Sequence, residues 1–142
     1  MVELVVTRGL PGCGKSTWAK AWVAENVTHR ARVERDQLRN MMHDGVWKGR
    51  ATEDQVVLGQ LAMVSALLTG GVSVVVSDTN LHEGVFNQLE ALAKQLDVEF
   101  TVQDFRDLPL DVCLKRNAQR TGKEFIPKHV ILDMYNKYIK EQ

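Results

Sequence analysis

Short apolar runs along the chain alternate with longer segments in which apolar positions recur at helical spacing. Residues 3–7, 72–77 and about 99–105 are rich in β-branched or apolar residues and predict strands. The run at 72–77 is almost continuously apolar, which favours the buried centre of a parallel sheet over a half-exposed strand. We therefore expect a sheet whose strands are separated along the chain by helices.

The segments between these runs carry good helix formers and helix-ending residues. A helix is predicted from Lys15 onward, and the pair Gly70-Gly71 ends another. The remaining predicted helices span 36–43, 53–68, about 82–96 and about 110–120, and a last one begins near Pro127. Parallel strands joined by helices require right-handed crossovers, so the sequence predicts an α/β fold with helices on both faces of the sheet.

Size and composition favour one compact unit. The 142 residues, 44% hydrophobic and 25% charged, are typical of one average globular domain, expected to span residues 1–142. No apolar stretch is long enough for a membrane span or a signal peptide, so we expect a cytoplasmic protein without membrane association. Cys13 and Cys113 stand far apart without metal-ligand spacing, which predicts reduced thiols.

The formal net charge is zero, which argues against a large DNA-binding footprint of the usual basic kind. The charges are nevertheless clustered. Basic residues concentrate in two segments: Arg30, Arg32, Arg35, Arg39, Lys48 and Arg50 in the first, and Lys115, Arg116, Arg120 and Lys123 in the second. Such clusters can be solvated helix faces, and only their relation to other motifs favours a functional interpretation.

The strongest motif follows the first predicted strand. Residues 9–16, GLPGCGKS, match G-x-x-x-x-G-K-[ST], the P-loop, with a strand before it and a helix after it. Backbone N–H groups of such a loop bind phosphates, its lysine neutralises the β- and γ-phosphates, and its serine binds Mg²⁺. A plain glycine turn is the alternative. The residues assigned to ATP binding here are Gly9, Gly12, Cys13, Gly14, Lys15, Ser16 and Thr17.

This motif specifies the fold class as an α/β sheet of P-loop NTPase type with a small lid. ATP is the expected donor, since the guanine-selecting N-K-x-D tetrad is missing: the only Asn-Lys pair is Asn136-Lys137. Mg²⁺ is the expected cofactor. Cys13 lies inside the loop, and its backbone is a better candidate for nucleotide contact than its thiol is for redox chemistry.

A phosphate acceptor needs a base and a positive charge, and the segment RDQLR offers both. Asp36 and Arg39 are three positions apart at a predicted helix start, so their side chains can share one face. Asp36 could accept the proton of the acceptor hydroxyl, while Arg39 holds an acceptor phosphate. The alternative for Asp36 is an ordinary helix N-cap.

The buried strand at 72–77 runs directly into Asp78, Thr79 and Asn80. A carboxylate at the end of such a strand can reach Mg²⁺ or its water shell, so we assign Asp78 to the metal together with Ser16. Thr79 and Asn80 are assigned to the acceptor side. A simple turn at the end of the strand is the alternative.

Arg116 and Arg120 lie four positions apart near the end of a predicted helix, before a loop that contains Gly122. This arrangement is typical of a mobile lid whose arginine closes over the triphosphate. We therefore expect both arginines to contact ATP and Arg120 to be catalytic. A basic helix end stabilised by the helix dipole is the alternative for either residue.

The segments GLPGCGKSTWA, RDQLR, VVVSDTNL and LKRNAQR, in this order, resemble the 5′-kinase domain of the phage polynucleotide kinase/phosphatase family. The resemblance covers nearly the whole chain. It implies a polynucleotide 5′-hydroxyl kinase that transfers the γ-phosphate of ATP to 5′-OH ends of DNA or RNA in nucleic-acid repair. It also implies that Lys15 and Ser16 contact phosphate and Mg²⁺, that Asp36 is the general base, and that Arg120 faces ATP. Phage encoding would place the protein in the host cytoplasm.

Two parts of the sequence depart from the family pattern. No D-x-D phosphatase loop is present, so we expect no 3′-phosphatase activity. Residues 43–53 contain no family motif, and Trp47 within them could stack on a base or pack against the protein.

Two other functions stay open. A kinase of a small-molecule hydroxyl, such as a sugar acid or a nucleoside, would share the P-loop, the base and the lid. A non-catalytic ATP-gated binding module would share only the P-loop and has no need of Asp36. The choice between DNA and RNA is also open.

Overall fold

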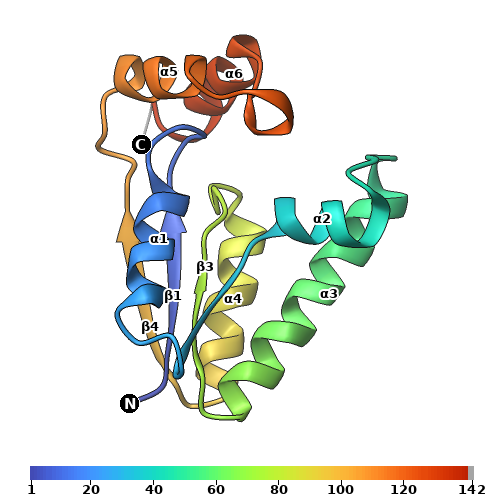
Figure 1. Cartoon of the computed structure of the whole chain (residues 1–142), viewed down its shortest axis with the longest axis vertical. Coiled ribbons are helices and arrows are strands. Elements are labelled where there is room, and N and C mark those ends of the chain that lie inside the picture. The colour runs from blue at the N-terminus through green and yellow to red at the C-terminus, as the bar shows by residue number, and fades with distance from the viewer. Residues whose placement is uncertain (141–142) are drawn as a thin grey trace.

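The computed structural model describes residues 1–140, except for the side chain of Lys123. This member of the second basic cluster therefore lies outside the described side chains. Helices and strands alternate along the chain (Figure 1). The elements are β1 (Glu3–Arg8), α1 (Lys15–Ala24), β2 (Arg30–Val33), α2 (Arg35–His43), α3 (Arg50–Thr69), β3 (Ser73–Val76), α4 (Glu83–Gln95), β4 (Glu99–Asp104), α5 (Leu110–Ala118), the 3₁₀ turn η1 (Gly122–Glu124) and α6 (Lys128–Tyr138).

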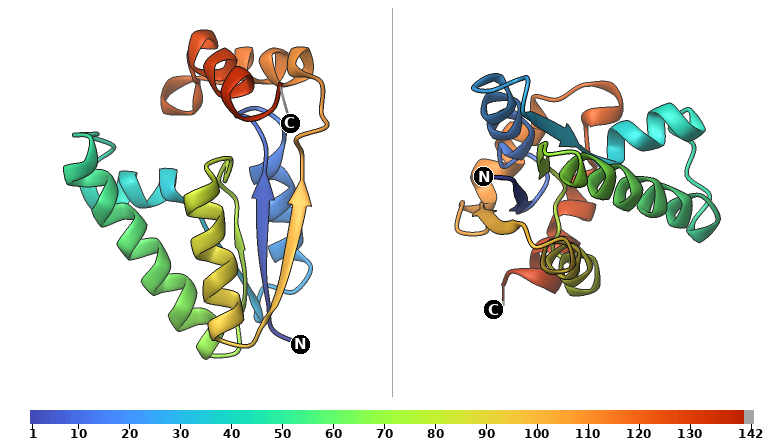
Figure 2. Two further views of the ribbon diagram at one scale, coloured as in Figure 1. Left: turned by 180° about the vertical axis from the view of Figure 1, so that it is seen from behind. Right: turned by 90° about the horizontal axis from the view of Figure 1, so that it is seen from below.

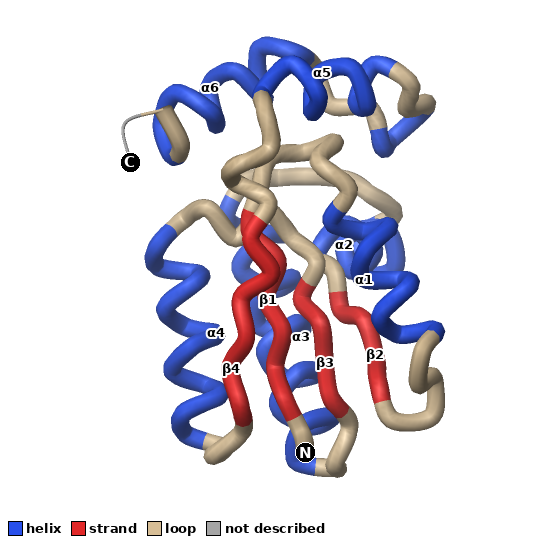
Figure 3. Tube along the Cα trace, turned by 90° about the vertical axis from the view of Figure 1, so that its left-hand side faces the viewer, coloured by secondary structure: helices blue, strands red, loops and turns tan. Residues whose placement is uncertain are grey.

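All four strands of the sheet are parallel, in the order β2-β3-β1-β4. Val5 of β1 is in register with Val75 of β3 on one side and with Thr101 of β4 on the other. The carboxyl ends of the strands therefore lie along one edge of the sheet, below α5 and α6 (Figure 3). In open α/β sheets ligands bind outside this edge.

Alternate residues of the central strands point to opposite faces of the sheet, and helices cover both faces (Figure 2). Val6 and Val76 pack against α3 and α4, while Val5 and Val75 pack against α1 beside Trp22. This two-sided burial explains why β3 is continuously apolar. The predicted α/β fold with helices on both faces is confirmed.

The sequence pattern did not predict β2, which reads Arg-Ala-Arg-Val. This strand lies at the edge of the sheet and pairs only with β3. Both of its arginines have partners: Arg30 stacks on the Trp22 ring at 4.4 Å, and Arg32 pairs with Glu34. An edge position with charged side chains removes the apolar signal on which the prediction depended.

Two predicted helix bounds are corrected as well. Helix α3 begins at Arg50 rather than at Glu53, after Gly49 with a positive φ of 62°. Helix α5 ends at Ala118, and Arg120 stands beyond it, before η1. Arg120 is therefore on a connecting segment, not on the helical face that its spacing from Arg116 suggested.

We call residues 110–138, which comprise α5, η1 and α6, the lid. A separate apolar cluster joins it to the P-loop, with Leu10 and Cys13 packed against Cys113 and Ile131. Asn117 fastens the lid internally: its side chain accepts from the Ile126 N–H at 3.0 Å and donates to the Ile126 carbonyl at 2.6 Å. Among residues 1–140, no helix is both long and apolar enough to cross a bilayer.

Candidate active site

Two adjoining cavities, of about 450 and 280 Å³, lie at the carboxyl edge of the sheet. Five residues line both of them, and these come from the P-loop helix, the start of α2 and the lid. The shared lining residues are Ser16, Glu34, Asp36, Arg39 and Arg120. The structure thus brings the predicted phosphate loop, acceptor segment and lid arginine to one place.

Glycine is required by geometry at two positions of the P-loop. Gly12 and Gly14 have φ values of 86° and 95°, in the left-handed region that favours glycine. A Cβ on Gly12 would lie 2.5 Å from the Cys113 carbonyl oxygen, so the lid packs directly on the loop backbone. Gly14 is also the N-cap of α1, which directs the positive end of that helix into the site.

Lys15 is buried, with 7% of the residue exposed. Its ammonium group donates to the Leu10 carbonyl at 2.6 Å and contacts the Cys13 sulfur at 3.5 Å. Burial lowers the pKa of Lys15, and the neighbouring Cys13 opposes this shift. A buried cation held against the loop backbone is a suitable group for neutralising phosphate charge.

Cys13 and Cys113 are both buried free thiols. The Cys113 thiol and the charge of Lys15 together lower the pKa of Cys13 to about 6. Burial of Cys13 opposes this shift. The pKa of Cys113 is raised by its contact with Cys13. Cys13 therefore belongs to the contact between loop and lid, and its carbonyl accepts from Arg116 Nη1 at 3.1 Å.

The Ser16 hydroxyl, predicted to bind Mg²⁺, donates to Glu34 Oε1 at 2.7 Å. Glu34 Oε2 accepts from Arg32 Nη1 at 2.8 Å. Hydroxyl and carboxylate oxygens are hard donors that suit Mg²⁺. The described residues hold no cluster of three or more His, Cys, Asp or Glu that could enclose a metal ion. A partial set of donors fits Mg²⁺, which usually keeps several waters and phosphate oxygens as ligands.

Asp78, the other predicted metal ligand, contacts the start of α2. Its Oδ1 accepts the Arg35 backbone N–H at 2.9 Å, and its Oδ2 accepts from the Gln60 amide at 2.7 Å. Burial raises the pKa of Asp78, and Arg35 and Gln60 oppose that rise. Among the hydrogen bonds of the described residues none joins Asp78 to Ser16; the carboxylate on that hydroxyl is Glu34.

Asp36 lies in the first turn of α2 and pairs with Arg39 of the same helix. The N-cap of this helix is Glu34, so the alternative of Asp36 as an ordinary N-cap does not hold. The Asp36 side chain is 73% exposed and borders both cavities, which leaves it accessible to an incoming hydroxyl.

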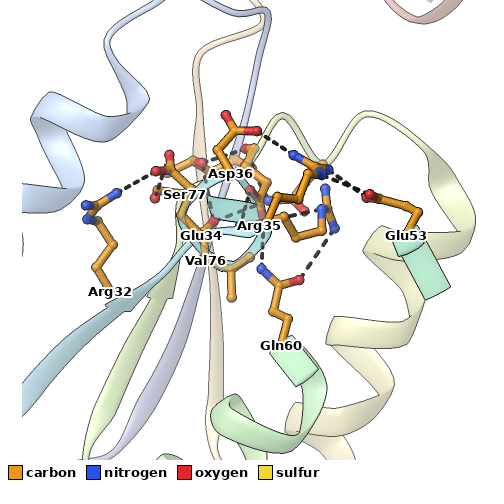
Figure 4. Close-up of polar contacts among 12 residues, drawn as sticks. Arg32, Glu34, Arg35, Asp36, Glu53, Gln60, Val76 and Ser77 are labelled. Carbon is orange, nitrogen blue, oxygen red and sulfur yellow. Dashed lines mark hydrogen bonds and ion pairs between the residues drawn. The ribbon is translucent and has the colours of Figure 1, made fainter. Parts of the chain in front are cut away.

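Arg39 is held by a second carboxylate, from α3. Glu53 accepts from Arg39 Nε at 2.8 Å and from Nη2 at 2.6 Å, a bidentate pair (Figure 4). These hydrogen bonds lower the pKa of Glu53 and raise that of Arg39. The guanidinium is therefore fixed in direction at the cavity wall.

Both lid arginines reach the P-loop side of the molecule. Arg116 contacts the Cys13 carbonyl, and its Nη1 would lie 3.1 Å from a Cβ on Gly14. Arg120 borders both cavities, and its charge helps to lower the pKa of Lys15. Its Nη1 donates to the Glu124 carbonyl at 3.2 Å, a contact within the lid.

The remaining predicted residues divide into lining and buried positions. Thr17 lines the larger cavity and Thr79 the smaller one, and the Thr79 carbonyl accepts from the Gly9 N–H at 3.0 Å. Asn80 is buried and lines neither cavity; its amide donates to the carbonyls of Thr7, Val76 and Asp78. Trp47 is 66% exposed and so is not packed inside the protein.

Sequence reasoning missed three residues that organise the site: Glu34, Glu53 and Gln60. The position of Glu34, two residues before Asp36 and at the end of an unrecognised strand, was the one available signal for it. Glu53 and Gln60 lie on α3, and the helical pattern of that segment predicts a helix without indicating a role for its polar residues. Their contacts with Arg39 and Asp78 join segments far apart in the sequence.

Comparisons with known proteins show the family of the chain and its similarity to kinases. A family model described as an AAA domain matches residues 4–140. The L-seryl-tRNA(Sec) kinase of Methanococcus maripaludis is 33% identical over 138 residues, which cover 95% of this chain and 52% of that protein. The chain therefore spans about half the length of this relative.

Two further similarities involve larger proteins. The putative bifunctional polynucleotide kinase/RNA ligase of Autographa californica nuclear polyhedrosis virus is 27% identical over 151 residues, covering 97% of this chain and 21% of that protein. A chain in the structure of the Pnkp1/Rnl/Hen1 RNA repair complex superposes with a TM-score of 0.82 at 29% identity, over 99% of this chain and 45% of that one.

Proposed function

The chain belongs to the AAA domain family and is a P-loop kinase, and from this premise we propose that it is an ATP- and Mg²⁺-dependent polynucleotide 5′-hydroxyl kinase. The observation that carries the proposal is that Asp36 and Arg39 border the same cavities as Ser16 and Arg120. A base, an acceptor-binding cation, the phosphate loop and a lid arginine are the parts that phosphoryl transfer to a hydroxyl requires. In this proposal residues 1–142 form one kinase domain.

Each of these residues has a role in the transfer. Gly9, Gly12, Gly14 and the following residues of the loop bind the ATP phosphates through backbone N–H groups, and Lys15 neutralises their charge. Mg²⁺, when bound through Ser16, neutralises charge that develops on the phosphates.

Asp36 accepts the proton of the 5′-hydroxyl, and its exposed carboxylate allows the acceptor to approach. Arg39 binds the phosphate next to the terminal nucleoside, and Glu53 holds its guanidinium in place for that contact. Arg120, with Arg116 beside it, stabilises the charge on the transferred group from the lid side.

The acceptor is proposed to be a nucleic acid because of three observations together. The RDQLR and SDTNL segments resemble those of polynucleotide kinases, the viral relative is described as a putative bifunctional polynucleotide kinase/RNA ligase, and the superposed chain belongs to an RNA repair complex. Besides Arg39, the basic side chains of Lys20 and Arg32 line the larger cavity. A chain of phosphates can use several cations, whereas a small hydroxyl compound has no need of them.

A second acceptor, the seryl hydroxyl of a seryl-tRNA, is favoured by the 33% identity with the archaeal L-seryl-tRNA(Sec) kinase. The seryl hydroxyl is carried on a tRNA, and the 5′-hydroxyl of the first candidate can also belong to an RNA. The base and the P-loop would act alike on either substrate, so the acceptor itself must be tested.

The test is transfer of labelled γ-phosphate from ATP in the presence of Mg²⁺. The acceptors are a 5′-OH oligonucleotide, the same strand already 5′-phosphorylated, a seryl-tRNA, and a panel of sugars and nucleosides. We expect label only on the 5′-OH strand, in DNA, RNA or both, and none with Asp36→Asn, whereas Glu90→Gln on the exposed face of α4 should behave as wild type.

Label on seryl-tRNA alone would replace the first acceptor by the second. Label on a sugar or nucleoside alone would overturn the nucleic-acid assignment and leave the P-loop kinase. Binding of ATP without any transfer would favour the ATP-gated binding module.

A further inference from the structure

Glu34 stands at the N-cap of α2 but does not cap it. Its backbone is extended, with φ −133° and ψ 133°, and its side chain makes no hydrogen bond to the first turn of the helix. The Asp78 carboxylate accepts the Arg35 N–H, the first of the helix. The Glu34 carboxylate, which does not act as the usual N-cap acceptor, turns toward the P-loop and the Ser16 hydroxyl.

The contacts of Glu34 centre on hydroxyl groups beside the phosphate loop. Its Oε1 accepts from Ser16 at 2.7 Å and from Ser77 at 3.4 Å, and only 11% of its side chain is exposed. A serine hydroxyl has one proton and two lone pairs. Because that proton is directed to Glu34, the lone pairs of Ser16 are left free on the side of the cavities that both residues line.

Arg32 balances the charge of this carboxylate. Its Nη1 donates to Glu34 Oε2 at 2.8 Å (Figure 4), whereas Ser16 binds the other oxygen of that carboxylate. Glu34 also accepts from the hydroxyl of Ser77, the residue directly before Asp78, so the two acids are neighbours. Without Arg32, a second negative charge next to Asp78 would oppose the binding of a polyphosphate.

We propose that Glu34 is a positioning residue for Mg²⁺ at the P-loop: it orients the Ser16 hydroxyl for the ion and supplies negative charge beside it, with Arg32 as its counter-ion. The proposal rests on the proposed kinase function. Glu34 then has a part of the metal role that was predicted for Asp78, and Asp78 anchors the start of α2. Groups that orient a metal ligand in this way typically contribute about 10- to 100-fold to metal affinity.

The test measures metal binding directly. Mn²⁺ replaces Mg²⁺, and electron paramagnetic resonance reports bound Mn²⁺ in the presence of a non-hydrolysable ATP analogue. In parallel, a fluorescent ATP analogue is titrated in EDTA and at rising Mg²⁺ concentrations. The variant is Glu34→Gln, which keeps the length of the side chain and an oxygen able to accept from Ser16, and the matched control is Glu90→Gln.

For Glu34→Gln we expect unchanged nucleotide affinity in EDTA and an increase of about 10-fold or more in the Mg²⁺ concentration needed for half-maximal binding. Mn²⁺ affinity should fall by a similar factor. Arg32→Gln, which leaves Glu34 without its counter-ion, should weaken nucleotide binding in EDTA, the opposite pattern. Glu90→Gln should match wild type in all conditions.

Equal metal dependence in wild type and Glu34→Gln would overturn the proposal and leave the kinase function intact. Weaker nucleotide binding by the same factor in EDTA and in Mg²⁺ would also overturn it, because Glu34 would then only brace the loop. Wild-type protein that binds no nucleotide under any condition would overturn the proposed function and this inference together.

Discussion

The Asp78 carboxylate, at the end of the strand segment that contains β3, accepts the backbone N–H of Arg35 at 2.9 Å and so fixes the start of α2. Gln60 of α3 donates to the other oxygen of the same carboxylate. One buried acid therefore joins the sheet to both helices of the acceptor side. The position of Asp36, the next residue in α2, depends on that joint.

Removal of this carboxylate should destabilise the protein. In Asp78→Ala the Arg35 N–H and the Gln60 amide lose a buried partner, and we expect the free energy of unfolding to fall by about 3 kcal/mol. Chemical denaturation measures the change, with Glu90→Gln as a control that removes an exposed carboxylate. An Asp78→Ala protein as stable as the control would mean that water or Glu34 accepts the hydrogen bonds from the Arg35 N–H and the Gln60 amide instead.

The contact between lid and P-loop can be tested with two glycines of nearly equal φ. Gly12 and Gly71 have φ values of 86° and 87°, but a Cβ would meet the Cys113 carbonyl at 2.5 Å in the first and nothing within 4 Å in the second. Gly71→Ala should cost about 1 kcal/mol of unfolding free energy from backbone strain alone. Gly12→Ala should cost about 2 kcal/mol more because the lid must shift. Equal losses in the two variants would show that the lid is not tightly seated.

The pair between Arg39 and Glu53 predicts a dependence of stability on pH. Hydrogen bonds from Arg39 lower the pKa of Glu53 from its ordinary 4.5, so the pair stabilises the fold fully above that pH. Its contribution is lost as the pH falls through the lower pKa of the folded protein. Melting temperatures of wild type and Glu53→Gln should differ at pH 7 and converge on acidification below 4.5. A difference that stays constant across this range would contradict an ionised pair.

Arg120 should affect turnover far more than nucleotide binding. If it stabilises the transferred phosphoryl group, Arg120→Ala lowers kcat by about 10³-fold while the affinity for ATP changes much less. The matched control is Arg50→Ala, since the Arg50 side chain is 94% exposed and only weakly paired. Loss of ATP affinity without loss of kcat would assign Arg120 to ground-state binding instead.

The fold was largely predictable because its signals are local. The apolar runs of β1 and β3 and the glycine loop between β1 and α1 each identify an element without knowledge of its neighbours. The edge strand β2 could not be found in this way. Its two arginines have partners, the Trp22 ring and Glu34, that become adjacent only after folding.

The site was predictable where a motif names the chemistry and less so where contacts set the role. The spacing of Asp36 and Arg39 correctly predicted a shared helix face. The sequence pointed to Asp78 and not to Glu34 as the acid near the P-loop serine, because Asp78 follows a clear apolar strand while Glu34 follows β2, which the pattern does not predict. Only the fold shows that Glu34 contacts Ser16 while Asp78 contacts Arg35.

The order of the strands also bears on how the chain folds as it is made. The strand β1 occupies a central place between β3 and β4, and Glu3 at its start pairs with Glu99. Both neighbours come much later in the chain, β3 at Ser73–Val76 and β4 at Glu99–Asp104, so neither exists when β1 has just been synthesised. Folding therefore begins with an apolar strand that must wait for distant partners, which predicts slow, late collapse of the nascent protein and reliance on chaperones during that interval.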